Sequence, residues 1–371
     1  MKIAMIGHKR IPSREGGIEI VVGELSSRLA AAGHQVTAYN RKSRHIAGSK
    51  YDGKREKSFG NVRLKWVYTP ESSKLNAIVY SFFATLSAVF GKYDVIHFHA
   101  EGPASMVIFA RLFRKRSIVT IHGLDWQRAK WGGFATKFLL FGEKCAAKYA
   151  DEVIVLSRNV QKYFKDTYGR DTVYIPNGIS PAESVSPDII SKKYGIEKDG
   201  YILFLGRLVP EKGIHYLINA YKSLDTSKKL VIAGGASHTG EYESELRALA
   251  KDNSSIVFTG FVQGKELEEL YSNAYIYVLP SDLEGMPISL LEAMSYGNCC
   301  LTSDIPECTE VCEDRAVYFE KGKEESLSRQ LKLLCSDEAL VSAYKAQAAD
   351  YICKKFSWDE VTRQTLKLYK N

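Results

Sequence analysis

Two basic side chains bracket a short turn in the second half of the chain. Arg207 follows the β-rich run Tyr201–Leu205 and Lys212 precedes a helical pattern, with Gly206 and Gly213 at the ends of the turn. An arginine offers a planar fork of donors and a lysine a point charge, so together they suit one phosphate group. A solvated surface cation is the usual state of either residue alone. Their pairing between a strand end and a helix start favours anion binding.

A second anion site is predicted where the run Tyr275–Leu279 ends. Pro287 suits the first turn of a helix, because a backbone N–H there would have no partner in the helix. The amides around Met286 and Ile288, next to Gly285, would then be available to a ligand. The segment from Gly285 to Ile288 is therefore a candidate contact for an anion.

Two carboxylates flank the same helix start. Glu284 lies in the loop that follows the strand, and Glu292 lies one to two turns into the helix. Carboxylates accept hydrogen bonds from hydroxyl groups, which makes them suitable for holding a sugar or a ribose. The alternative for Glu292 is a solvated helix face, but its neighbours Leu290, Leu291 and Ala293 are apolar, and a charge among them needs a partner.

A pair of glycines stands before the first helical pattern of the chain. At Gly16 and Gly17 the backbone has no Cβ, so it can approach an anion that the helix dipole favours. Lys9, Arg10 and Arg14 in the same loop favour a phosphate over the alternative of a simple glycine turn. No G-x-G-x-x-G is present, which weighs against a nicotinamide oxidoreductase.

Histidines occur at the ends of two neighbouring runs in the first half. His97 and His99 would share one face of a strand, and His122 ends the next strand, before a glycine. A two-histidine metal site is one interpretation, but no third ligand lies near in the sequence. We expect His122 to contact a substrate hydroxyl, with a purely structural role as the alternative. The chain has no Asp-x-Asp, so Arg207 and Lys212 would neutralise a diphosphate and we expect no metal.

Short β-rich runs alternate with helical patterns throughout, which is typical of βαβ units and parallel sheets. We therefore expect an α/β protein with two doubly wound halves. The predicted strands are 2–6, 35–39, 95–98, 117–121, 152–156, 173–175, 201–205, 229–233, 256–259 and 275–279, and the predicted helices are 19–32, 214–224, 242–251, 265–273 and 288–296.

A polar segment rich in Pro and Ser, Ile179–Asp188, separates the two halves and reads as a linker. We predict one domain over 1–180 and a second over 181–355. The stretch from Glu325 onward is helical in period except at Phe356–Trp358, and the final helix, 356–371, could fold back to the first domain. Two such domains face to face would enclose a cleft lined by strand ends.

Charge is distributed unevenly between the halves. Residues 1–180 have 29 Lys and Arg against 14 Asp and Glu, whereas the remainder has 22 against 29. This asymmetry argues against a uniformly basic nucleic-acid surface and suggests that the first half faces an anion or an anionic membrane. The apolar run Leu75–Phe90 is too short to span a bilayer, and no signal peptide precedes the first strand, so we expect a cytoplasmic protein. Leu75–Phe90 is either a membrane-contacting segment or a core helix.

Taken together, the motifs resemble a known family. The turn G-R-L-x-x-E-K-G at Gly206–Gly213 and the segment E-G-x-P-x4-E-A-M at Glu284–Met294 resemble the retaining family-4 glycosyltransferases with the GT-B fold. The resemblance extends over essentially the whole chain. Two further segments, Gly16–Glu19 and His122–Trp131, resemble more narrowly the bacterial rhamnosyltransferase-like enzymes that build surface polysaccharides. Ile18 differs from the aromatic residue common in those relatives.

The resemblance implies a role for each matching residue. Arg207 and Lys212 would hold the donor diphosphate, Glu284 the hydroxyls of the transferred sugar and Glu292 the nucleotide ribose. Gly17 and the amides from Met286 to Ile288 would approach the phosphates or the sugar. His122 would lie beside the reacting centre, and the acceptor-side candidates are Glu19, Asp125 and Trp126.

The resemblance therefore predicts a cytoplasmic hexosyltransferase that needs no metal and no cofactor. It would move a sugar from a nucleoside diphosphate to a saccharide or lipid-linked saccharide. Two alternatives stay open: a nucleotide-sugar epimerase of the same fold, and a non-catalytic subunit that binds nucleotide sugars. The sequence leaves the nucleotide, the sugar, the acceptor and the linkage open.

Overall fold

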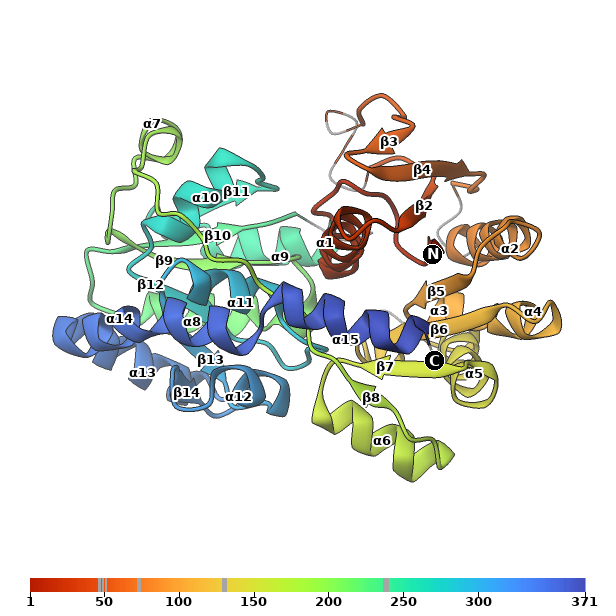
Figure 1. The fold of residues 1–371 in the computed structure, drawn as a ribbon. Helices are drawn as coiled ribbons and strands as arrows, with labels where there is room; N and C mark the ends of the chain where they lie inside the picture. Colours follow the sequence, from red (N-terminus) through yellow and green to blue (C-terminus); the bar gives the residue numbers. More distant parts are fainter. Residues whose placement is uncertain are drawn as a thin grey trace. The chain divides into compact units, whose positions relative to one another are not determined.

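The computed structural model describes residues 1–45, 48, 50, 52–71, 75–128, 132–235 and 240–370. Its contacts divide the chain into two compact units, one formed by Met1–Gly178 with Trp358–Asn371 and the other by Ile179–Ser357. Each unit is an α/β domain around its own central sheet (Figure 1). The C-terminal helix α15 (Trp358–Lys370) therefore belongs to the first unit.

The first unit has a sheet of eight strands in the order β3-β4-β2-β1-β5-β6-β7-β8. All pairs are parallel except the short β3–β4 hairpin. The strands are β1 (Lys2–Ile6), β2 (Gln35–Arg41), β3 (Ser58–Phe59), β4 (Val62–Val67), β5 (Val95–His99), β6 (Arg116–Ile121), β7 (Glu152–Val155) and β8 (Val173–Tyr174).

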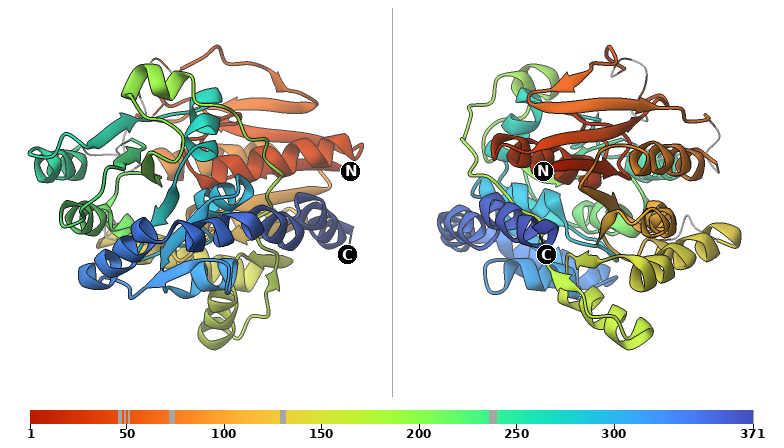
Figure 2. Two further views of the ribbon diagram at one scale, coloured as in Figure 1. Left: turned by 90° about the vertical axis from the view of Figure 1, so that its left-hand side faces the viewer. Right: turned by 45° about the vertical axis from the view of Figure 1, so that its right-hand side comes forward.

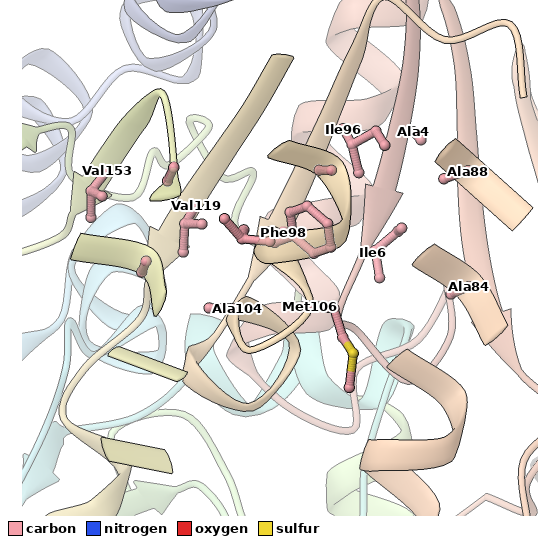
Figure 3. Packing of buried hydrophobic residues seen from close by; sticks show 14 of the residues in the cluster. Ala4, Ile6, Ala84, Ala88, Ile96, Phe98, Ala104, Met106, Val119 and Val153 are labelled. Atoms are coloured by element: carbon pink, nitrogen blue, oxygen red, sulfur yellow. The ribbon is translucent and has the colours of Figure 1, made fainter. Parts of the chain in front are cut away.

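The central strands of this sheet are buried on both faces, because successive residues of a strand point to opposite faces and all residues of β1 after Lys2 are apolar and buried. Ala4 and Ile6 pack beside Ala84 and Ala88 of a helix, whose small side chains allow a close approach (Figure 3). On the other side, α15 packs against α1 (Figure 2). The other helices are α1 (Gly17–Ala31), α2 (Asn76–Val89), α3 (Glu101–Ala104), α4 (Val107–Leu112), α5 (Phe134–Tyr149) and α6 (Arg158–Tyr168).

The second unit has a parallel sheet of six strands in the order β11-β10-β9-β12-β13-β14. Its strands are β9 (Tyr201–Leu205), β10 (Lys229–Ala233), β11 (Ile256–Gly260), β12 (Ile276–Leu279), β13 (Cys299–Ser303) and β14 (Val317–Phe319). Its helices are α7 (Ile189–Tyr194), α8 (Ile214–Lys222), α9 (Glu241–Ala250), α10 (Lys265–Ser272), α11 (Ile288–Ser295), α12 (Pro306–Cys312), α13 (Glu324–Ser336) and α14 (Glu338–Lys355).

The strand orders place a topological switch point in each unit. In the first unit the chain leaves β1 toward β2 and later returns to the other side of β1 as β5. In the second unit β9 is followed by β10 and β11 on one side and by β12, β13 and β14 on the other. Crevices at the carboxyl ends of strands beside such a point are the usual ligand sites of doubly wound sheets. The loops after β9 and β12 are therefore the first places to look for function.

The predicted α/β class and the predicted strands are confirmed, and several elements were missed. Strand β4 has the buried–exposed alternation of a sheet strand, with Arg63 and Lys65 at exposed positions. The expectation that the last stretch is interrupted only near residue 356 is wrong. A further break falls at Asp337, whose carboxylate accepts the backbone N–H of Leu340 (2.8 Å) and so caps α14. The later break is shorter than expected, because Trp358 already belongs to α15.

The run Leu75–Phe90 contains the helix α2 and the two residues that cap it, and it has two different sides. Tyr80, Ala84 and Ala88 are buried against the sheet, whereas Phe83 and Phe90 are exposed. Within the described ranges, no helix is both long enough and apolar enough to cross a membrane.

Candidate functional site

The turn after β9 brings Arg207 and Lys212 to the carboxyl end of the sheet. A short 3₁₀ turn at Pro210–Lys212 closes it, with the amide of Gly213 donating to the carbonyl of Pro210 (3.0 Å). Gly213 has a φ of +63°, and a Cβ there would lie 2.0 Å from the carbonyl oxygen of Pro280. Only glycine therefore lets this turn pack directly on the loop that follows β12.

Hydrogen bonds join the loop after β9 to the loop after β12. The amide of Asp282 donates to the carbonyl of Glu211 (2.9 Å), and the hydroxyl of Tyr216 donates to the Asp282 carboxylate (3.3 Å). From the end of β13, the Ser303 hydroxyl donates to the carbonyl of Ser281 (2.5 Å). The two sequence motifs, about 70 residues apart, thus form one surface at the switch point.

Lys212 and Glu284 contact each other in this surface. Lys212 Nζ lies 2.5 Å from Glu284 Oε1, and the two side chains are only 11% and 9% exposed. The buried Ser281 hydroxyl donates to the same carboxylate oxygen (2.7 Å). A charge-assisted pair with little exposure holds both groups in fixed positions. A cation for a phosphate and a carboxylate for hydroxyl groups are therefore preorganised side by side.

The helix that follows this loop begins where the sequence predicted, at Ile288. Pro287 precedes the helix in an extended conformation and does not belong to its first turn, which corrects the sequence-based placement. Gly285 and Met286 are buried, as are Pro287 and Ile288. Arg207, after β9, is partly buried.

Glu292 has the partner that its apolar surroundings require. It lies on α11, and the hydroxyl of Tyr271, from α10, donates to its Oε2 (3.1 Å) and to the carbonyl of Ser289 (3.3 Å). Glu292 is half-buried, so its carboxylate combines a fixed orientation with access for a polar ligand.

In the first unit, α1 begins at Gly17, two residues before the predicted start at residue 19, so that only Gly16 of the glycine pair precedes the helix. Gly16 is extended, and a Cβ there would lie 2.9 Å from Glu19 Oε2. Glu19 is buried, and its other oxygen accepts the backbone N–H of Lys9 (2.8 Å). The acceptor-side candidate Glu19 therefore holds the loop between β1 and α1 in place.

Acidic side chains neutralise two of the three cations in that loop. Lys9 Nζ lies 3.6 Å from Glu15, and Arg10 Nη1 lies 2.9 Å from Asp52. Arg14 is partly buried. Ion pairs within the protein therefore neutralise part of the positive charge that the sequence predicted for phosphate binding in this loop.

His122 belongs to a row of histidines. Its Nε2 lies 3.1 Å from Nδ1 of His99, and the rings of His97 and His99 stack at 4.2 Å, on one face of β5 as predicted. His97 Nδ1 lies 2.7 Å from the hydroxyl of Tyr369 in α15. Burial lowers the pKa of His122 to about 4 and that of His97 to about 3, so both rings are neutral near pH 7.

The remaining acceptor-side candidates lie in a 3₁₀ turn after β6. The amide of Asp125 donates to Glu101 (3.0 Å), and the carboxylate of Asp125 pairs with Arg128 (2.8 Å). Trp126 is half-buried, and its ring nitrogen has no hydrogen-bond partner among the described residues. The rest of the segment that carried the narrower resemblance, 129–131, lies outside the described residues.

Metal ligands do not gather at either group of residues. In the part of the chain that the structure describes, no three His, Cys, Asp or Glu side chains are close enough to hold an ion together. The sequence reasoning missed the residues that position the site: Ser281, Tyr271 and Tyr369. Ser281 precedes Glu284 by three residues and was within reach of motif analysis, whereas nothing in the sequence connects Tyr369 with His97.

Two family models match the chain, one for each unit. Residues 15–183 match the model described as Glycosyltransferase Family 4, and residues 187–351 match that described as Glycosyl transferases group 1. The boundary between the two matches falls close to the boundary between the structural units.

Similar proteins are known from archaea and bacteria. An uncharacterised glycosyltransferase of Methanocaldococcus jannaschii is 26% identical, over 100% of this chain and 98% of its own. The O-antigen chain mannosyltransferase RfbU of Salmonella typhimurium is 30% identical over 58% of this chain and 59% of its own. The crystal structure of HepE from Anabaena in complex with UDP and glucose has the same fold, with a TM-score of 0.81 and 18% identity, over 99% of this chain and 98% of that one.

Proposed function

We propose, from the premise that the chain is a glycosyltransferase of the GT-B type, that it moves a sugar from a nucleoside diphosphate to a saccharide acceptor with retention of anomeric configuration. The observation that carries the proposal is the contact between Lys212 and Glu284 at the switch point of the second unit. A diphosphate needs cations, and a sugar needs acceptors for its hydroxyl groups. This surface offers both within one hydrogen-bond length.

Each residue has a defined role in the proposed reaction. The bond between the anomeric carbon and the diphosphate oxygen breaks, and Arg207 and Lys212 stabilise the charge that develops on the departing diphosphate. The acceptor oxygen forms the new bond from the same face, and its proton passes to the departing phosphate. No base from the protein and no metal enters this scheme, because the two cations replace the metal at the diphosphate.

Further residues would orient the two substrates. Glu284 accepts hydrogen bonds from the transferred sugar, and Glu292, fixed by Tyr271, accepts them from the ribose. Gly17 and the segment from Gly285 to Ile288 approach the phosphates or the sugar. On the acceptor side, neutral His122 contacts a hydroxyl of the reacting sugar, with Asp125 and Trp126 on the turn that follows it.

The relatives guide the proposed biological context. RfbU is named for the O antigen, a surface polysaccharide, and the HepE structure holds UDP and glucose. We therefore propose a hexosyl donor and a role in assembling bacterial surface polysaccharide such as a capsule. The acceptor would be a lipid-linked saccharide, which places the enzyme at the cytoplasmic face of an anionic membrane.

A donor screen tests the proposal. UDP-, dTDP- and GDP-sugars are offered to the full-length protein, and both thermal stabilisation and release of nucleoside diphosphate are measured. One nucleotide sugar should stabilise the protein, and at ~100 times its dissociation constant the effect is ~2.7 kcal/mol. That donor should then be turned over, without inhibition by a chelator, and transferred to a saccharide with its anomeric configuration unchanged.

Two outcomes of the same screen would overturn the proposal. Isomerisation of the donor in the absence of an acceptor would identify an epimerase. Tight binding of a nucleotide sugar with neither hydrolysis nor transfer to any saccharide would identify a binding subunit.

A further inference from the structure

We infer that the outer side of α2 and α4 is a docking surface for an anionic lipid bilayer. Exposed large hydrophobic residues are concentrated there: of the twelve in the described ranges, nine lie on α2, α4 and α5 or next to the ends of these helices. The nine are Leu75, Phe82, Phe83, Leu86, Phe90, Leu112, Phe113, Phe134 and Phe141.

The exposed side chains of α2 form a continuous stripe. Phe82, Phe83, Leu86 and Phe90 recur every three to four residues, so they lie along one side of the helix. The opposite side, including Ala84, is buried against the sheet. The stripe is therefore additional to the apolar residues that the core of the unit uses.

Ring contacts join this stripe to α4. The centroids of Phe82 and Phe109 lie 6.0 Å apart, and those of Phe90 and Phe113 lie 4.9 Å apart, in edge-on arrangements. Phe90 is 69% exposed and Phe113 43%. We call these rings, together with Phe83 and Leu86, the aromatic face. Contiguous apolar surface of this kind marks contact with a partner or a membrane.

Charge identifies the partner as anionic. The segments 75–93, 103–116 and 132–150, which contain the three helices, have eight Lys and Arg, whereas their one acidic residue, Glu143, is fully buried. Lys92 and Arg114 are exposed and adjoin the contact between Phe90 and Phe113. Of the nearby acidic residues, Asp94 accepts the backbone N–H of Lys2 and Asp151 pairs with Arg111, so cations remain in excess around the rings. Apolar rings beside an excess of cations match the boundary between acyl chains and anionic headgroups.

The length of α2 determines how it would bind. Its 14 residues extend about 21 Å, short of the ~30 Å hydrocarbon core, so it would lie in the plane of the interface. This inference rests on the proposed function, because a lipid-linked acceptor would be the reason for the enzyme to bind a membrane. Vesicle binding itself can be measured without catalytic turnover.

Vesicle sedimentation of the full-length protein tests the surface. The protein should sediment with vesicles of phosphatidylcholine and phosphatidylglycerol at low salt, and much less with phosphatidylcholine alone or at high salt. The variant Phe90→Ser/Phe113→Ser should weaken binding at least about tenfold, because two exposed rings that would become buried in the bilayer are lost. Lys92→Gln/Arg114→Gln should weaken it about fivefold per charge and leaves the packing of the rings intact.

Matched controls lie in the second unit. Leu333→Ser removes a hydrophobic residue that is 44% exposed, and Lys251→Gln removes an exposed cation. Both should bind vesicles like the unchanged protein. Absence of vesicle binding at low salt, or equal loss in the control variants, would overturn the inference. So would a lipid-free dimer that Phe90→Ser/Phe113→Ser converts to a monomer, since the aromatic face would then join two copies.

Measuring both donor hydrolysis and vesicle binding distinguishes a wrong docking surface from a wrong proposed function. Donor hydrolysis without vesicles should be the same in the surface variants as in the unchanged protein. A protein that binds these vesicles but turns over no nucleotide sugar would retain the docking surface and lose the proposed reaction.

Discussion

Lys212 donates to Glu284 across 2.5 Å, so the groups assigned to the phosphate end and the sugar end of a donor are hydrogen-bonded to each other before any donor binds. A nucleotide sugar would engage both groups at once, whereas a nucleoside diphosphate would have to attract Lys212 alone. We therefore expect recognition of the two ends of the proposed donor to be coupled through this contact.

The first prediction concerns Glu284→Gln. The amide retains a hydrogen-bonding group but no charge, so the affinity for the nucleotide sugar should fall by ~10- to 100-fold, the value of a charged hydrogen bond. Affinity for the nucleoside diphosphate should stay equal or rise, because Lys212 is released from its partner. Calorimetric titration with both ligands measures the difference, and a parallel loss for both would contradict the coupling.

Removing the cations should impair the chemical step. Arg207→Ala and Lys212→Ala should each lower kcat by ~10²–10³, as expected when one preorganised donor to developing charge is lost. Lys222→Ala, at the exposed end of α8, is the matched control and should leave kcat unchanged. Normal rates in either of the first two variants would show that the phosphate lies elsewhere.

The tight turn at Gly213 provides a test based on backbone geometry. Gly213→Ala would place a Cβ 2.0 Å from the carbonyl of Pro280 in a conformation that favours glycine, so the two loops must separate. A displacement of about 1 Å at a reacting centre costs ~10²-fold in rate. Gly240→Ala has open space around its Cβ and a negative φ, and should leave the rate unchanged. Equal rates for both variants would contradict the arrangement.

The buried histidines predict how stability depends on pH. Burial lowers the pKa of His97 to about 3, below the 6.5 of an exposed histidine, so protonation favours the unfolded chain. The stability of the first unit should therefore be constant above about pH 7 and fall between about pH 6.5 and pH 3. At about pH 5.5 the loss from His97 is ~1.4 kcal/mol.

His97→Gln separates this effect from general acid sensitivity. Glutamine can keep a hydrogen bond to Tyr369 or Thr120 but takes up no proton. Thermal unfolding between about pH 7.5 and pH 5 should show a shallower decline for the variant than for the unchanged protein. Parallel curves would show that the ring of His97 does not cause the loss.

Local patterns in the sequence predicted most of the parallel strands, because these strands are largely buried on both faces. Two such runs are Lys2–Ile6, which is apolar after Lys2, and Tyr201–Leu205, and they coincide with β1 and β9. Strand β13 was missed because Leu301 is the only large apolar residue in Cys299–Ser303, and the burial of this strand follows from its place between β12 and β14. Tertiary context, not local propensity, makes that segment a strand.

The positions of the candidate site residues could be predicted in part, because they depend on the predicted strands. Loop residues follow strands, so their place at the sheet edge can be predicted once the strands are known. The contact between Lys212 and Glu284 could not, because it requires that β12 lie beside β9, although β10 and β11 come between them in the chain. The partner of His97 could not be predicted either, since Tyr369 comes from the far end of the chain.

The last prediction concerns a buried glutamate of α10 that contacts the start of α7. Glu269 is fully buried, and its Oε2 accepts three backbone N–H groups at the start of α7, from Asp188 (3.0 Å), Ile189 (2.7 Å) and Ile190 (3.1 Å). These bonds attach the segment that enters the second unit to α10. Charged hydrogen bonds are worth ~1.5–3 kcal/mol each, and their loss leaves buried donors without partners. Glu269→Ala should therefore lower the unfolding free energy of this unit by at least ~3 kcal/mol, measured by urea denaturation. The neighbouring exposed Glu268→Ala is the control and should change it by less than ~0.5 kcal/mol, so an equal effect of the two substitutions would show that the three bonds do not stabilise the unit.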